Sequence, residues 1–156
     1  MKSATHLQAL VKSRSWDKEI LLWAGSEKSL QQALGTETFI RLDLLDLFEP
    51  SSLPLDEDAT RDQLRDRLRS RLKEIHSGPD NRVILVVKSI GLLARYSVGL
   101  TMFYDWFVGS FTLVILLLEG GQEATEWPEE VRCESNRLLK YFSEPGMVKE
   151  VFNTNG

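Results

Sequence analysis

Four stretches of the chain are almost continuously apolar over the length of a strand. Buried strands of a parallel sheet have this pattern, because helices cover both of their faces. The expected strands are residues 19–25, 38–44, 82–87 and 111–118, and a further edge strand is expected at residues 130–134.

Elsewhere, apolar residues recur at spacings of three and four, which predicts amphipathic helices. In the clearest helix Leu64, Leu68, Leu72 and Ile75 share one face. Its acids lie towards the start and its bases towards the end, which suits the helix dipole. Other helices are expected at residues 3–12, 29–34, 92–106 and 135–142.

The alternation of strands and helices predicts an α/β fold with a mostly parallel sheet between two helical layers. A length of 156 residues fits a single domain, residues 1–156. Within it we expect an N-terminal helix in residues 1–17, the sheet core in residues 18–121 and a C-terminal strand and helix extension in residues 122–156.

Composition and charge narrow the classes of function. Hydrophobic residues make up 42% and charged residues 27% of the chain, as in ordinary globular proteins. Nineteen Lys and Arg against 23 Asp and Glu give a net charge of −4. The chain therefore lacks the excess of basic residues of a dedicated nucleic-acid binder, although a local basic face is still possible. One Cys excludes an internal disulfide, and with two His it offers no zinc-finger spacing, so no metal is expected.

Residues 96–118 are apolar and long enough to cross a bilayer. Asp105 lies in the middle of this stretch, where a carboxylate costs about 2.5–3.5 kcal/mol on insertion scales. Gly99 and Gly109 also divide it, so we expect a buried helix followed by a buried strand, and no membrane partner. The first residues lack the apolar core of a signal peptide, which favours the cytoplasm.

Gly25, Lys28 and Ser29 follow the first strand in the manner of a phosphate-binding loop. That loop needs Gly immediately before its Lys and again five residues earlier, where this chain has Glu27 and Leu22. The strand that should end in a magnesium-binding acid runs instead into Lys88. We therefore interpret Gly25, Lys28 and Ser29 as a vestigial phosphate loop without a nucleotide cofactor; an anion held at this helix start is the alternative.

No other group of residues indicates catalysis. His6 and His76 are far apart in the sequence, and nothing in the sequence sets a base beside Cys133 to activate its thiol. The prediction is a protein without catalytic residues.

Two groups of residues could instead contact a partner. Arg61, Arg65 and Arg69 form a row at i, i+4 spacing that could meet phosphates or an acidic protein, unless Asp62 and Asp66 merely neutralise a solvated face. Aromatic side chains are favoured at interfaces. The candidates of this second group are Tyr104, Asp105, Trp106 and Trp127, with an Asp105–Arg95 ion pair as the structural alternative.

The order of these features resembles the small accessory proteins of BREX bacteriophage-exclusion systems, of the BrxB and BrxF types. The resemblance covers residues 18–121, and it includes Ile90-Gly91 after the third strand and the late strand ending in Glu119-Gly120. The chain lacks the Gly-Lys-Ser/Thr loop of the BrxF type. It also lacks two features of the BrxB type, the Pro after the Ile-Gly turn and the Pro-Gly after the late strand.

The resemblance implies a P-loop-NTPase-like fold without a functional phosphate loop. It also implies a non-enzymatic scaffold subunit that docks onto a larger defence protein, such as an alkaline-phosphatase-like subunit. A divergent nucleotide-binding ATPase-like protein and a nucleic-acid-binding accessory subunit are the alternatives, and a homo-oligomer is compatible with each.

Overall fold

A computed structural model describes residues 2–13, 16, 18–47, 56–75, 82–106, 111–119 and 135–153. Its strands form one six-stranded sheet in the order β1-β6-β2-β5-β4-β3, and every neighbouring pair is parallel. The strands are β1 (Lys2–Ser3), β2 (Lys18–Ala24), β3 (Ile40–Asp43), β4 (Arg82–Lys88), β5 (Phe111–Leu118) and β6 (Glu150–Asn153). The α/β class and the parallel sheet are therefore confirmed.

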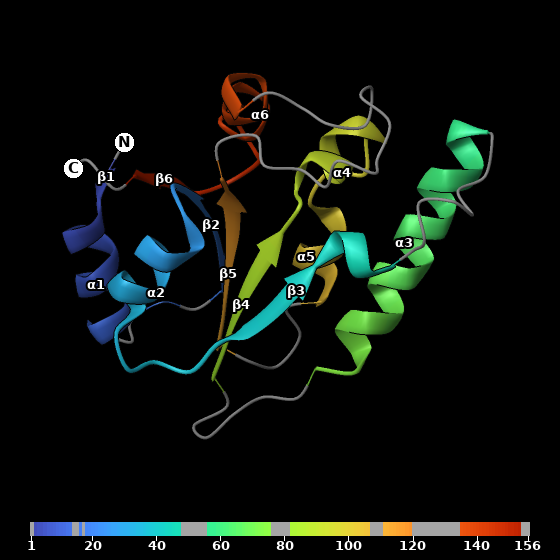
Figure 1. Cartoon of the computed structure of the whole chain (residues 1–156). Coiled ribbons are helices and arrows are strands. Elements are labelled where there is room, and N and C mark those ends of the chain that lie inside the picture. The colour runs from blue at the N-terminus through green and yellow to red at the C-terminus, as the bar shows by residue number, and fades with distance from the viewer. Residues whose placement is uncertain are drawn as a thin grey trace.

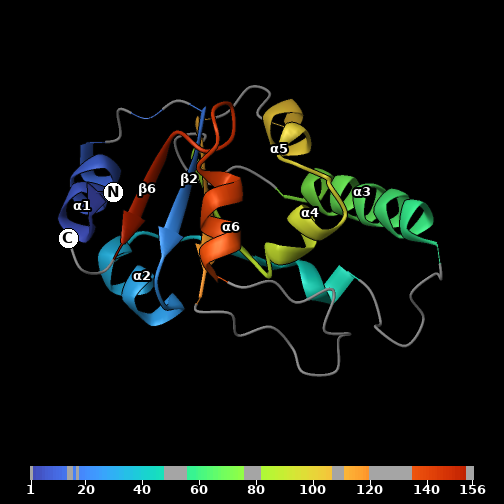
Figure 2. The same ribbon diagram turned by 90° about the horizontal axis from the view of Figure 1, so that it is seen from above.

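Helices cover both faces of the sheet, as Figures 1 and 2 show. On one face lie α1 (Ala4–Ser13) and α2 (Glu27–Leu34). On the other lie the 3₁₀ turn η1 (Leu44–Leu47) and the helices α3 (Glu57–Lys73), α4 (Gly91–Arg95), α5 (Thr101–Trp106) and α6 (Ser135–Phe142).

Alternation along the central strands produces two hydrophobic clusters, one for each face. Trp23 of β2 and Ile115 of β5 face α1 and α2, where Leu30 packs against them. Their neighbours Leu22 and Leu116 face the larger helical layer. Both strands are buried on both faces because each is covered by helices, which explains why they are apolar at almost every position.

The expected helix over residues 92–106 is wrong as a single element. Ser97 and Gly99 adopt positive φ angles of 54° and 69°, which a continuous right-handed helix excludes. The chain turns between α4 and α5, where the Val98 amide donates to the Leu93 carbonyl at 2.9 Å. As a result α5 packs against α3.

Two strands were not expected, β1 and β6, which are only two and four residues long. The strand expected at residues 130–134 lies outside the described residues. Among the helices that the structure does describe, none is long and apolar enough to cross a membrane.

Candidate functional site

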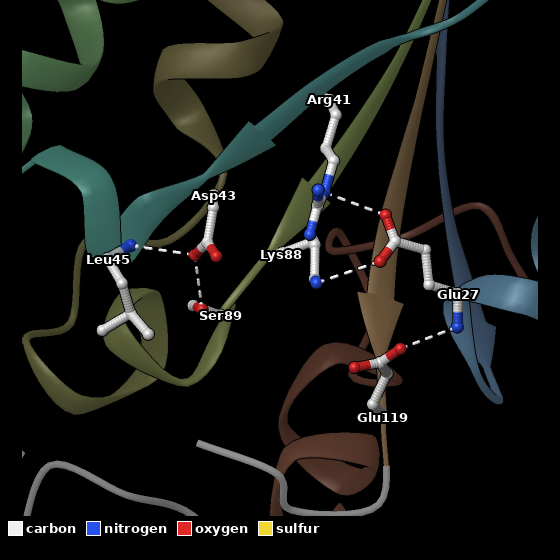
Figure 3. Close-up of polar contacts among 7 residues, drawn as sticks. All are labelled: Glu27, Arg41, Asp43, Leu45, Lys88, Ser89 and Glu119. Atoms are coloured by element: carbon white, nitrogen blue, oxygen red, sulfur yellow. Dashed lines mark hydrogen bonds and ion pairs between the residues drawn. The ribbon is translucent and has the colours of Figure 1, made fainter. Parts of the chain in front are cut away.

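The first candidate site lies where the parallel strands end, at the carboxyl edge of the sheet. Ligands of open α/β sheets bind at this edge. Here it contains the loop from β2 to α2 and the ends of β3, β4 and β5 (Figure 3). We call this group of polar residues the carboxyl-edge network: Glu27, Arg41, Asp43, Lys88, Ser89 and Glu119.

The loop after β2 begins α2 through its own side chains. Ser26 is the N-cap, and its hydroxyl accepts a hydrogen bond from the Ser29 amide at 3.1 Å. The Ser29 hydroxyl donates to the Ser26 carbonyl at 2.7 Å and accepts from the indole N–H of buried Trp23 at 3.2 Å. The hydroxyl that a phosphate loop would offer to Mg²⁺ is thus engaged within the chain.

Glu27 connects three elements at the centre of the network. Its carboxylate accepts from Arg41 Nε of β3 at 2.9 Å and from Lys88 Nζ of β4 at 3.0 Å. The Glu27 and Lys88 side chains are only 19% and 18% exposed, so this ion pair is largely shielded from water. Figure 3 shows both cations pointing at the one carboxylate.

Glu119, directly after β5, caps the start of α2 from outside the helix. Its Oε1 accepts a hydrogen bond from the Glu27 amide at 2.7 Å. A helix amino terminus carries unpaired amides and partial positive charge, and both favour an anion. In this protein the anion is a carboxylate of the same chain.

Asp43 organises the other end of the network. Its Oδ1 accepts from the Leu45 amide at 3.1 Å and from the Ser89 hydroxyl at 2.6 Å. Ser89 has a φ of 60°, which is uncommon for a residue other than Gly and marks a sharp turn after β4. The bond from Ser89 joins the ends of β3 and β4, and the bond from Leu45 holds the turn from β3 into η1.

The second candidate site is a pocket of about 330 Å³ between α3 and α5. We call it the α3–α5 pocket, and its lining residues are Arg69, Leu72, Lys73, Met102, Asp105 and Trp106. Leu72, Met102 and Trp106 supply its apolar surface, with two cations from α3 and one carboxylate from α5. It exists because the turn at residues 96–100 brings α5 against α3.

The residues singled out from the sequence fall into separate places. Arg69, Asp105 and Trp106 come together in the α3–α5 pocket. Arg61 instead pairs with Asp58 one turn earlier on α3. Trp127 lies outside the described residues.

Tyr104 points away from that group. Its hydroxyl donates to the Met147 carbonyl at 2.6 Å, which ties α5 to the segment between α6 and β6. Burial raises the pKa of the Tyr104 hydroxyl, so it keeps the proton that it donates.

The alternative of an Asp105–Arg95 ion pair is wrong, and Asp105 is exposed. Arg95 pairs with Glu57 at the start of α3, because it ends α4 while Asp105 is on α5. The hydrogen bond and the charge of Arg95 hold the pKa of the Glu57 carboxyl below its usual value.

Of the residues that the sequence suggested as a vestigial phosphate loop, Gly25 donates its amide to the Leu118 carbonyl at 3.1 Å, and Lys28 is exposed. Sequence reasoning missed Arg41, Asp43 and Glu119, although a signal was present. Asp43 and Glu119 are charged residues at or directly after the end of an apolar strand, which is where an α/β fold gathers its polar groups.

No cluster of three or more metal-ligating side chains occurs among the described residues. Comparisons of the chain with models of protein families, with curated proteins and with solved structures find no match.

Proposed function

We propose that the protein is a non-enzymatic docking subunit with a P-loop-like fold, which binds a larger protein of a bacterial anti-phage defence complex. One observation carries the proposal. Glu27 pairs with both Arg41 and Lys88 beside a helix start that Glu119 already caps. Arg41, Lys88 and the first amide of α2, which a phosphate at this edge could otherwise use, are therefore engaged by carboxylates of the chain, while Lys28 is exposed.

The order of elements supports the relation to P-loop proteins. A buried parallel strand, β2, leads through a short loop into α2, as the strand before a phosphate loop does. Lys88 ends β4 where a P-loop protein has its magnesium-binding acid, so the proposed relation does not include the nucleotide-binding residues.

Competition within the chain favours a loop that does not bind nucleotide. A helix start stabilises an exposed anion by about 0.3–1 kcal/mol. A phosphate at this loop would have to displace the Glu119 carboxylate from the Glu27 amide and compete with Glu27 for Arg41 and Lys88, so the partners it needs are already used within the chain.

Calorimetric titration with ATP and Mg²⁺ tests this part of the proposal. We expect no binding heat from the wild-type chain. A binding heat that Lys28→Ala abolishes would instead favour the divergent nucleotide-binding protein. Lys140→Ala is the matched control, because Lys140 is an exposed lysine of α6, on the opposite face of the sheet from α2.

Co-purification tests the docking part. The chain, expressed together with the products of the genes beside its own, is expected to elute with one larger protein in a stable complex. Association with none of these products would contradict docking. Neighbouring genes without any defence function would contradict the anti-phage setting while leaving docking open to measurement.

A further inference from the structure

We infer that the α3–α5 pocket binds an acidic segment of a partner protein, which inserts an apolar side chain and places carboxylates on Arg69 and Lys73. The inference rests on the proposed docking function and names the kind of segment that docks. Its basis is the position of two cations and one carboxylate around an apolar surface.

The pocket is held by well-buried residues on both of its helices. Leu68 and Leu72 of α3 are 0% and 2% exposed, and Phe103 of α5 is 0% exposed. These side chains fix α3 and α5 in the core, so the space between the helices is formed before any partner arrives. At about 330 Å³ it is at the small end of ligand pockets and suits one or two large side chains.

The cations beside the pocket are poorly neutralised. Arg65, Arg69 and Lys73 follow one another at i, i+4 spacing along α3. Arg69 lies 3.4 Å from Asp66, but these side chains are 57% and 77% exposed, and exposed pairs of this kind contribute little. Neither Arg65 nor Lys73 forms an ion pair with any residue that the structure describes. On a chain with a net charge of −4, this local basic row favours carboxylates.

Asp105 decides between an acidic protein and a nucleic acid. Its carboxylate lines the pocket together with the two cations. A phosphate backbone carries a charge at every nucleotide and would meet it as a like charge, whereas an acidic peptide can place its carboxylates on the two cations and an uncharged amide N–H beside Asp105. The apolar surface of Leu72, Met102 and Trp106 also suits an inserted side chain, and aromatic or aliphatic anchors of this kind dominate protein interfaces.

A library of random peptides, panned against the full-length chain, tests the inference directly. We expect the enriched peptides to share a large apolar residue flanked by Asp or Glu. A synthetic copy of the strongest peptide should bind Arg69→Glu/Lys73→Glu at least about tenfold more weakly than wild type, because each tenfold change needs only about 1.4 kcal/mol. The peptide affinity of Arg69→Gln/Lys73→Gln should lie between that of wild type and that of Arg69→Glu/Lys73→Glu.

Arg71→Glu is the matched control. Arg71 is on the same helix, is 45% exposed, lies 3.8 Å from Glu74 and does not line the pocket, so its replacement should leave peptide affinity unchanged. Thermal unfolding of each variant confirms that the fold is intact. Failure to enrich any peptide, enrichment without acidic residues, or equal loss in Arg71→Glu would overturn the inference. So would salt-sensitive binding of labelled oligothymidine that depends on Arg69 and Lys73.

The same variants separate this inference from the proposed function. If wild type and Arg69→Glu/Lys73→Glu co-purify equally well with a neighbouring gene product, docking stands and the α3–α5 pocket is not the docking site. If wild type co-purifies with no such product, docking fails, and the peptide titration still decides whether the pocket binds acidic segments.

Discussion

The carboxyl-edge network and the α3–α5 pocket use the same kinds of side chain in opposite ways. Each contains two cations and at least one carboxylate. In the network, Lys88 and Glu27 are 18% and 19% exposed and pair at 3.0 Å. In the pocket, Arg69 is 57% exposed and lies 3.4 Å from an exposed aspartate of its own helix.

This difference between the network and the pocket shows that location in the fold does not by itself identify a binding site. The carboxyl edge is the usual ligand site of an α/β sheet, yet here each carboxylate is bonded to a cation, an amide or a hydroxyl of the same chain. The pocket lies on one face of the sheet, but it contains cations that carboxylates of the described residues neutralise only weakly. Measurements of stability test this contrast, because replacing a charge that is paired within the chain should destabilise the fold, whereas replacing an unpaired charge should not.

The largest effect is expected from Glu27→Ala. This change removes the partner of both Arg41 and Lys88, and loss of one member of a buried pair costs about 3–5 kcal/mol. Because this group is only partly buried, we expect the free energy of unfolding to fall by about 2–3 kcal/mol, measured by urea denaturation. Lys28→Ala, at an exposed position of the same helix, should change it by less than about 0.5 kcal/mol. Equal losses of unfolding free energy in Glu27→Ala and Lys28→Ala would contradict a structural role for the Glu27 ion pairs.

Next is Ser29→Ala, which removes the acceptor of the Trp23 indole N–H. An unpaired buried donor costs about 1–3 kcal/mol, so we expect a loss of about 1–2 kcal/mol in thermal or urea unfolding. Ser143→Ala is the control, since its exposed hydroxyl bonds the Leu139 carbonyl at 2.6 Å and water can replace that bond. A larger loss in Ser143→Ala would contradict a structural role for the Ser29 hydroxyl.

Lys73→Ala should have a smaller effect on folding. An exposed cation without an ion pair among the described residues contributes less than about 0.5 kcal/mol, so the urea midpoint should stay near that of wild type. The same variant should weaken binding of the enriched acidic peptide. A destabilisation as large as that of Glu27→Ala would show that the pocket cations are structural as well.

The smallest effect concerns the exposed Glu57–Arg95 pair. The folded pKa of Glu57 is lowered, so the pair stabilises the fold above the ordinary Glu pKa of about 4.3, and this contribution is lost as the pH falls through the lower folded pKa. Urea denaturation of wild type and Glu57→Gln should therefore differ slightly at neutral pH and converge in acid. A difference that does not change with pH would contradict the assignment.

Pattern reasoning found the elements whose burial is uniform. β2, β4 and β5 are apolar at almost every position because helices cover both faces, and α3 has its Leu residues on one face. It failed for the helix expected over residues 92–106, because backbone conformation ends that helix and the positive φ of Ser97 cannot be recognised from the spacing of apolar residues. It also failed for β6, which is too short to show a pattern.

The residues of the two sites could be predicted only as far as they lie close together in the sequence. Lys28 and Ser29 pointed to the right loop because that loop follows a strand in sequence. Glu119 meets Glu27 because β5 pairs with β2, and Arg41 meets it because β4 and β3 follow β5 in the sheet. The spacing of residues along the chain does not reveal this strand order. The alternative partner considered for Asp105, Arg95, fails for a related reason, since the break between α4 and α5 separates the two residues.

The place of β6 between β1 and β2 affects how the chain folds during its synthesis. Within the described part of the chain, Lys2 and Ser3 pair with Phe152 and Asn153 alone, so the first strand has no neighbour until residues 150–153 have added to β2. The ribosome must therefore synthesise residues 4–149 after β1 before the sheet can close at that side. Contacts of such long sequence separation form slowly, and until they form the outer edge of β2 is open to unwanted pairing with another nascent chain.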